Sequence, residues 1–307
     1  MNSYPIIFLH KGNPEYLRIA LDRLILSNGD AKIILLGDES NKNISGVDHY
    51  FISDYFNTAK KFEDNYYIHM SKNSYEFELI CYQRWFVISE FIRQREYNTF
   101  WYLDSDVLVY SNLNDYLKSI PNYKKYDLIG FDSSTEEGDF FNPSFNFYTS
   151  KSFQGITDYL INSYVDNKVF MELANKWRIH TKENKPGGVC DMTQLKLFFL
   201  SKSLNVYNSY NSHNDIIPDG NININTNHGN GEKYKMIEGL KYTKIVDYNV
   251  LVYLEDGSTK KIISTHFQGA AKGVMKWYSK RNSTIEKMIL YIKIHKIKKY
   301  CLALFKK

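Results

Sequence analysis

The sequence predicts an α/β protein with a mixed, mostly parallel central sheet flanked by helices, and two observations carry this prediction. Residues 5–9 and 32–36 are short apolar runs, which are typical of strands buried on both faces. Between them, residues 14–26 repeat apolar side chains at helical spacing before an Asn-Gly-Asp turn signal. A strand, a helix and a strand in such close succession form a βαβ unit, whose two strands are parallel.

The later elements follow from the same periodicities. Further strands are predicted at residues 47–52, 100–109, 126–131, 141–148, 242–246, 250–254 and 260–264. Further helices are predicted at residues 77–91, at a short segment ending near 117, at 153–182 in two pieces, and at 195–200. Residues 208–231 are rich in Asn, Ser and Gly and are predicted to form a loop or lid, whereas residues 53–74 give no clear pattern.

The net charge of +5 is concentrated at the C-terminus. Residues 276–307 carry ten Lys and Arg but a single acid, Glu286, so the remainder is slightly acidic and a nucleic-acid binder is not indicated. We expect a main domain over residues 1–278 and a basic amphipathic helical tail over residues 279–307. Such a helix is typical of a membrane-surface element, and the alternative is a helix that packs on its own domain.

Cysteine usage and the N-terminus predict a cytoplasmic protein, peripheral at the membrane through its tail. Cys81, Cys190 and Cys301 are odd in number and lack metal-ligand spacing, so we expect reduced thiols. The first ten residues lack the charged and long apolar regions of a signal peptide. The chain has no apolar run of the roughly 18 residues that suggest a membrane span.

Two carboxylates interrupt the apolar run of residues 100–109. In an extended strand, Asp104 and Asp106 point the same way, so their negative charges lie close together unless a cation or a proton intervenes. Hard oxygen ligands suit Mg²⁺ or Mn²⁺, so the pair predicts a divalent metal site. The alternative is a pair of solvated loop carboxylates at a strand end.

Other charged side chains follow the first two strands or lie on an apolar helix face. In open α/β sheets, ligands bind beyond the carboxyl ends of the strands, and these ends carry His10, Lys11 and Asp38. Asp38 is expected to accept hydrogen bonds from the hydroxyls of a ribose. The alternative is that Asp38 is simply a turn residue. Arg84 lies on the apolar face of the helix at 77–91 and needs an anionic partner. That partner is a phosphate, the paired aspartates or a structural salt bridge.

A second group of polar residues follows the last predicted strand. His266 is a ligand type for divalent transition metals, Gly269 permits close approach of the backbone to a phosphate, and Lys272 supplies positive charge. Together they are typical of an anion or metal-phosphate site. The alternative for His266 alone is a hydrogen-bonded structural histidine.

Together, the two segments resemble a known enzyme family. Asp104-Ser105-Asp106 after an apolar strand is similar to the DxD motif of GT-A glycosyltransferases, which have a Rossmann-like fold. The segment from His266 to Lys272 resembles the His-x-x-Gly-x-x-Lys signature of their retaining family 8, the glycogenin-like and lipooligosaccharide galactosyltransferase-like enzymes. The resemblance covers about residues 4–278. This chain departs from the family pattern after the lysine, where Gly273 replaces the usual Pro-Trp.

The resemblance implies roles for the matched positions. A Mn²⁺ or Mg²⁺ ion would be held by Asp104, Asp106 and His266, with Asp104 also near the ribose. Gly269 and Lys272 would contact the diphosphate. The sugar side of the donor would be met by Arg84, Asn146 and Asp191, of which Arg84 contacts the sugar phosphate. Asn146 and Asp191 are the candidates for stabilising the transferring sugar.

The activity that the resemblance implies is transfer of a hexose from a UDP-sugar, with retention, as in polysaccharide biosynthesis. The donor would be a nucleoside diphosphate sugar, and the acceptor a hydroxyl of a glycan or a lipid-linked molecule. Two alternatives stay open at this point. One is a nucleotidyltransferase acting on sugar phosphates, although residues 10–13 are sparse for a triphosphate loop. The other is a non-catalytic nucleotide-sugar binder on the same fold.

Overall fold

The structure is a computed structural model that describes residues 3–133, 140–201, 204–211, 216–226, 231–285 and 289–290. Their contacts group into two compact units, each of which is described by itself. The first unit takes its residues from Met1–Asn13, Asp30–Asp104 and Ile120–Asn208. The second takes its residues from Pro14–Gly29, Ser105–Ser119 and Ser209–Lys307. The chain therefore passes between the units several times, once at the peptide bond that joins Asp104 to Ser105.

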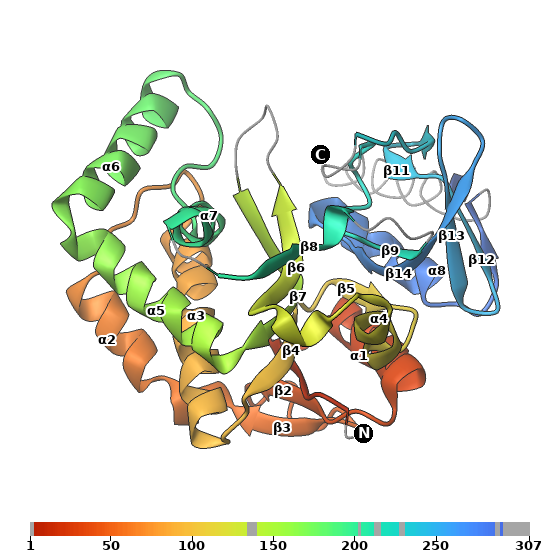
Figure 1. Ribbon diagram of the computed structural model, residues 1–307, viewed down its shortest axis with the longest axis horizontal. Helices are drawn as coiled ribbons and strands as arrows, with labels where there is room; N and C mark the ends of the chain where they lie inside the picture. The colour runs from red at the N-terminus through yellow and green to blue at the C-terminus, as the bar shows by residue number, and fades with distance from the viewer. Residues whose placement is uncertain are drawn as a thin grey trace, which may run out of the picture. The chain divides into compact units, whose positions relative to one another are not determined.

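A seven-stranded sheet forms the centre of the first unit (Figure 1). Its order is β3 (Asp48–Phe51), β2 (Ile33–Gly37), β1 (Ile6–Leu9), β4 (Thr99–Leu103), β7 (Phe140–Thr149), β6 (Leu128–Ser133) and β8 (Val206–Asn208). Four of the six strand pairs are parallel, and only β7 runs antiparallel to its neighbours β4 and β6. The predicted fold class, α/β with a mixed and mostly parallel sheet, is confirmed.

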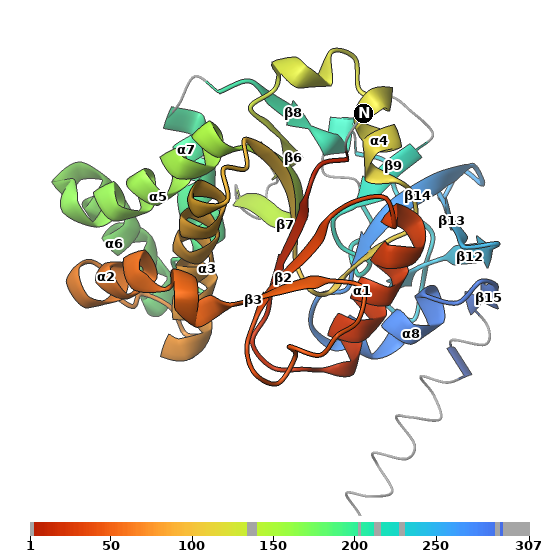
Figure 2. The same ribbon diagram turned by 90° about the horizontal axis from the view of Figure 1, so that it is seen from below.

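Five helices of the first unit gather on one side of this sheet (Figures 1 and 2). They are α2 (Asn57–Asn65), α3 (Tyr75–Gln94), α5 (Ser150–Val165), α6 (Asn167–Lys182) and α7 (Asp191–Ser201). Short 3₁₀ turns lie at Ile52–Tyr55 and Tyr123–Lys125. Ser74 caps α3 by accepting from the Phe77 amide, and Asp166 caps α6, which explains the break predicted within residues 153–182. Fully buried aromatic side chains, such as Trp85 and Tyr148, fill the core beneath these helices.

The second unit is built on antiparallel strands. Its sheet has the order β15 (Ser283–Thr284), β12 (Thr243–Val246), β13 (Asn249–Tyr253), β14 (Thr259–His266) and β5 (Val107–Val109), and β9 (Ile216–Asp219) pairs with β14 in parallel. A separate hairpin joins β10 (Met236–Ile237) and β11 (Leu240–Lys241). Among its described residues the unit also has the helices α1 (Glu15–Asn28), α4 (Leu113–Ser119) and α8 (Met275–Tyr278), with 3₁₀ turns at Ser209–Asn211 and Gly269–Val274.

Two sequence expectations were wrong. Residues 100–109 are not one strand: β4 belongs to the first unit and β5 pairs with β14 in the second. Between them, Ser105 and Asp106 form a turn, so the two aspartates are not neighbours in an extended strand. The predicted loop at 208–231 contains β9, because the apolar Ile216 and Ile217 pair with β14 despite the surrounding Asn and Ser. The unpatterned stretch at 53–74 contains α2.

The predicted tail lies largely outside the described residues, which end with 279–285 and 289–290. Its amphipathic helix, its membrane partner and the boundary at residue 278 therefore stay predictions, as does the cytoplasmic location. None of the helices among the described residues is both long and apolar enough to cross a membrane. Cys81 and Cys190 are free thiols, and burial raises the pKa of each, whereas Cys301 lies outside the described residues.

Candidate functional site

Arg84 on α3 binds two carboxylates of the first unit. Its Nη1 donates to Asp104 Oδ1 at 2.9 Å, and its Nη2 donates to Asp191 Oδ2 at 2.5 Å. Tyr102 of β4 donates its hydroxyl to the same Asp104 oxygen at 2.8 Å, and Asp104 directly follows the last residue of that strand. The structure thus brings together three predicted site residues that lie far apart in the sequence.

Burial and the neighbouring carboxylates act in opposite directions on the charge of Arg84. The Arg84 side chain is only 12% exposed, and the planar guanidinium serves both carboxylates at once. Burial alone opposes the positive charge, but the anionic partners, Asp191 first, raise the pKa of Arg84 well above its usual range. The expected anionic partner of Arg84 is therefore found within the protein. Contact with a donor phosphate stays a prediction.

Asp191 is held at the start of α7 by a tight crossing of two loops. Its Oδ2 also accepts from the Trp85 indole at 3.0 Å. The loop before it pairs with the loop before α3, where the Val189 amide donates to the Met70 carbonyl at 2.8 Å. At Gly188 a Cβ would come within 2.4 Å of that carbonyl oxygen, so only glycine fits. The buried carboxylate of Asp191 therefore depends on a close backbone contact.

Asn146 lies within the first sheet, with its amide group bonded to backbone on both sides. Its Oδ1 accepts from the Phe131 amide at 3.2 Å, and its Nδ2 donates to the Asn142 carbonyl at 3.0 Å. The side chain is fully buried and fills the space beside Gly130, where β6 and β7 shift register. These contacts give Asn146 a clear structural task. Its role toward a donor sugar stays a prediction.

The carboxyl ends of β1 and β2 meet as expected. The Gly12 amide donates to Asp38 Oδ2 at 2.6 Å, and the amide of Ser40 donates to the other oxygen at 2.9 Å. These hydrogen bonds outweigh the opposing effect of burial and lower the pKa of Asp38. Asn41, three residues after Asp38, donates its side-chain amide to the His10 carbonyl at 3.0 Å. Asp38 thus organises the turn, which was the alternative considered for it.

A cavity of about 460 Å³ opens at these strand ends, within the first unit. Lys11 and Asp38 lie at its polar side, while Phe51 and Phe56 form an apolar wall. The Lys11 ammonium lies 5.3 Å from the centre of the Phe56 ring, a cation–π contact. The cavity has the volume of a small-molecule site and combines apolar walls with few polar groups.

Three predicted residues of the second unit form a tight ionic group. His266 ends β14, and its Nε2 lies 3.3 Å from Asp106 Oδ1. Lys272, in the following 3₁₀ turn, places its Nζ 3.0 Å from Asp106 Oδ2. The Phe267 amide also donates to the Asp106 carbonyl at 2.9 Å, which ties the turn of Asp106 to the end of β14. Although burial opposes its charge, His266 and Lys272 lower the pKa of Asp106 to about 2.

The hydrogen bonds of His266 determine which of its nitrogens faces Asp106. Its Nδ1 lies 3.0 Å from the Gly220 carbonyl, which can only accept, so Nδ1 carries a proton. In the neutral ring, Nε2 then presents a lone pair to a carboxylate 3.3 Å away. Two acceptors at that distance are stable only with a proton or a metal cation on the imidazole. A protein-bound metal has this arrangement, in which the distal nitrogen of the histidine donates to a carbonyl.

The 3₁₀ turn after His266 suits a ligand with negative charge. Gly269 opens it with a φ of +59°, a conformation that disfavours other residues, and a Cβ there would meet no described atom within 4 Å. Lys272 lies 4.9 Å from the centre of the Tyr16 ring, which supports its ammonium group from the side. The turn therefore exposes backbone and one lysine together.

Sequence reasoning missed several residues of these groups. Tyr102 was detectable, because it lies two residues before Asp104 in the strand predicted at 100–109. Gly220 and its neighbours were assigned to a loop, and nothing in the sequence links them to His266. Tyr16 gave no signal beyond the apolar pattern of its helix, and Phe56 lies in the stretch at 53–74 that gave no clear pattern.

Comparison with known proteins adds distant structural likenesses. No family model and no curated protein sequence matches the chain. Mouse xyloside xylosyltransferase 1 aligns with 67% of this chain and 84% of its own, at 12% identity and a TM-score of 0.44. The galactosyltransferase LgtC, solved with donor and acceptor sugar analogs, aligns over 67% and 73%, at 15% identity and a TM-score of 0.37. The glycosyltransferase GlyE of Streptococcus pneumoniae TIGR4 aligns over 69% and 47%, at 17% identity and a TM-score of 0.34.

These structures come from the class of enzymes that the sequence resembles. At such identities and TM-scores they do not assign an activity to this chain, so a functional conclusion has to rest on its own residues.

Proposed function

We propose that this chain is a metal-dependent glycosyltransferase that uses a nucleoside diphosphate sugar as donor. The observation that carries the proposal is the His266–Asp106 pair, in which a proton on Nδ1 turns the Nε2 lone pair toward a carboxylate. Such a pair attracts a divalent cation. Asp104, separated from Asp106 only by Ser105 in the chain, supplies a further carboxylate.

The donor set of two carboxylates and one imidazole suits Mn²⁺, and also Mg²⁺ with more water ligands. When bound, the metal would act as a Lewis acid that stabilises negative charge on the departing diphosphate. Lys272 would add a second positive charge, and the backbone at Gly269 would admit the phosphate oxygens. The protein side of the site thus matches a leaving group that carries the developing charge.

The first unit offers contacts for the rest of the donor. The 460 Å³ cavity at Lys11 and Phe56 suits the nucleobase, with uracil as the proposed base. Asp191, oriented by Arg84 and the Trp85 indole, would lie near the donor sugar and stabilise positive charge on its ring. Asn146 is proposed to contact the same donor sugar.

In the proposed reaction, the bond between sugar C1 and the diphosphate oxygen breaks, and its electron pair leaves with the phosphate. The acceptor hydroxyl forms the new C1–O bond, and its proton passes to the leaving phosphate. Attack from the face that the diphosphate leaves would retain the configuration of a hexose. The acceptor is a hydroxyl of a glycan or of a lipid-linked molecule.

The proposal is tested with Asp106→Asn, which preserves shape but removes the charge. Asp115→Asn is the matched control, since Asp115 belongs to the same unit and its side chain is 75% exposed. Mn²⁺ binding is followed by the EPR signal of the free ion, and turnover by release of UDP from UDP-hexoses. We expect Asp106→Asn to weaken Mn²⁺ binding by about a hundredfold or more and to abolish turnover, while the control behaves as wild type.

The outcomes separate this function from its alternatives. A wild-type protein that neither binds Mn²⁺ nor turns over any sugar nucleotide would overturn the proposal. Release of pyrophosphate from a nucleoside triphosphate and a sugar phosphate would identify a nucleotidyltransferase. Saturable binding of a sugar nucleotide without transfer or hydrolysis, in the presence of Mn²⁺, would identify a non-catalytic binder.

A further inference from the structure

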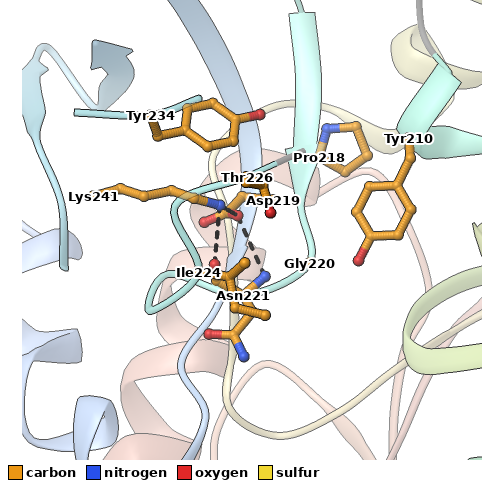
Figure 3. Close-up of a pocket in the computed structure, with 9 residues that line it drawn as sticks. All are labelled: Tyr210, Pro218, Asp219, Gly220, Asn221, Ile224, Thr226, Tyr234 and Lys241. Carbon is orange, nitrogen blue, oxygen red and sulfur yellow. Dashed lines mark hydrogen bonds and ion pairs between the residues drawn. The ribbon is translucent and has the colours of Figure 1, made fainter. Parts of the chain in front are cut away.

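A buried ion pair lies beside the backbone group that orients His266. Asp219, the last residue of β9, bonds Lys241 of β11, and both side chains are almost completely buried, at 3% and 4% exposed (Figure 3). Charges are seldom buried so deeply without a specific role, because desolvation is costly. Neither residue belongs to the donor set described above.

The pair fastens both ends of the turn that follows β9. Lys241 Nζ donates to the Asn221 carbonyl at 2.9 Å and lies 4.3 Å from the centre of the Tyr234 ring. Asp219 Oδ1 accepts from the Asn221 amide at 3.3 Å. Figure 3 shows the ammonium group directed toward the Asp219 carboxylate and the Asn221 carbonyl, and Gly220 lies between these two residues in the chain. The direction of the Gly220 carbonyl is therefore set by this ion pair.

That turn holds His266 at two points. The Gly220 carbonyl accepts from His266 Nδ1 at 3.0 Å, and the Ile222 amide donates to the His266 carbonyl at 3.1 Å. The Lys241 amide in turn donates to the Ile222 carbonyl at 3.0 Å, so β11 is bonded to the turn through its backbone as well. Both the ring and the main chain of His266 depend on the segment that Asp219 and Lys241 fasten.

The space beside the pair, among the described residues, is small. The cavity lined by Asp219, Lys241, Tyr210 and Thr226 has a volume of about 10 Å³, which is room for about one water molecule. As far as the described residues show, this volume leaves no room for a substrate or cofactor beside the pair. What remains is a structural task directed at the neighbouring histidine.

We propose that Asp219 and Lys241 are positioning residues that lock the Nδ1–H tautomer and the ring orientation of His266. This inference rests on the proposed function, in which Nε2 of His266 is a metal ligand. Hydrogen-bond partners of a ligating histidine fix its tautomer and raise its affinity for the metal. In this chain the hydrogen-bond partner of His266 is the Gly220 carbonyl. The buried salt bridge between Asp219 and Lys241 holds that carbonyl in its direction.

The test compares Lys241→Met with the double variant Asp219→Asn/Lys241→Met. The single variant leaves an unpaired buried carboxylate and is expected to lose stability, whereas the double variant leaves no buried charge and stays folded. Lys260→Met is the matched control, because Lys260 lies on β14 itself and pairs with Glu232, away from the turn of Gly220. Thermal unfolding of each variant establishes that it is folded.

Two readouts report on His266 rather than on stability. Long-range ¹H–¹⁵N spectra of protein labelled at histidine, recorded without metal in mildly alkaline buffer, give the tautomer, and the signal is assigned by its loss in His266→Gln. Mn²⁺ affinity is measured by EPR. We expect the folded double variant to show mixed tautomers at His266 and about 10- to 100-fold weaker Mn²⁺ binding, with both readouts unchanged in Lys260→Met.

A folded double variant with the wild-type tautomer and wild-type Mn²⁺ affinity would overturn the positioning role. If the wild-type protein neither binds Mn²⁺ nor turns over a sugar nucleotide, the proposed function fails, but the tautomer spectra still decide whether the pair orients His266.

Discussion

Replacing Arg84 by Met removes the cation that two aspartates share, and the structure sets the cost. Asp191 is 3% exposed, and without Arg84 its charge keeps, among the described residues, the Trp85 indole and the Met192 amide as donors. Removing one partner of a buried ion pair costs about 3–5 kcal/mol. The Asp104 side chain is 21% exposed, so water replaces part of its lost contact and adds about 1 kcal/mol at most. We expect a total loss of about 3–6 kcal/mol.

Urea unfolding measures this loss as a change in the free energy of unfolding. Arg93→Met serves as the control, since Arg93 is an exposed residue of the same helix and its replacement should change stability by only about 0.5 kcal/mol. In Arg84→Met/Asp191→Asn the uncompensated charge is gone, and we expect at least about 2 kcal/mol to be recovered.

A loss for Arg84→Met as small as that for Arg93→Met would refute the electrostatic account of this cluster. Additive effects in the double variant would show that Arg84 and Asp191 do not act as a pair. Arg84→Lys sharpens the comparison, because a single ammonium group keeps the charge but cannot serve both carboxylates in the geometry of the guanidinium fork.

The remaining predictions concern two glycines, with Gly273→Ala as a control because a Cβ there meets no described atom within 4 Å. In Gly130→Ala the new Cβ would lie 1.9 Å from Asn146 Oδ1, so we expect a loss of about 2–3 kcal/mol in urea unfolding. The loss should become much smaller when Asn146→Ala is already present, because only the Cβ of residue 146, 3.3 Å away, then remains; full additivity would contradict this packing. In Gly188→Ala the new Cβ would clash with the Met70 carbonyl and shift the start of α7, so we expect a loss of stability of about 1–3 kcal/mol. We also expect kcat to fall while KM changes less; a wild-type kcat would contradict the dependence of Asp191 on this loop.

Local patterns were sufficient for most elements but not for their assignment to sheets. The apolar runs at residues 5–9 and 32–36 and the helix between them appear as β1, β2 and α1 because both periodicities act over a few neighbours. Residues 100–109 read as one strand because a turn of two or three residues hardly disturbs an apolar average. Pairing decides the matter: β4 bonds β1 and β7, whereas β5 bonds β14, whose partner residues lie more than 150 positions away.

Asp106, His266 and Lys272 could be predicted from the sequence because carboxylates, imidazoles and ammonium groups each have a characteristic binding chemistry. The sequence did not reveal Asp219 or Lys241, which lie in or near a stretch rich in Asn, Ser and Gly and are 22 residues apart. Their importance comes from the partner that they orient, and an orienting residue needs no particular type. Residues of this kind become visible only once the hydrogen bonds of the functional side chain are known.

Arg84 shows the limit from the opposite direction. A guanidinium on an apolar helix face indicates a nearby anion, since the desolvation free energy of burying the charge alone is large. The sequence cannot say whether that anion belongs to the protein or to a ligand, because both satisfy the same requirement. In this chain two aspartates, 20 and 107 residues away, meet the need within the protein. A donor phosphate would therefore have to compete with Asp104 or Asp191 for Arg84, which makes this arginine a point where donor binding and the stability of the first unit are coupled.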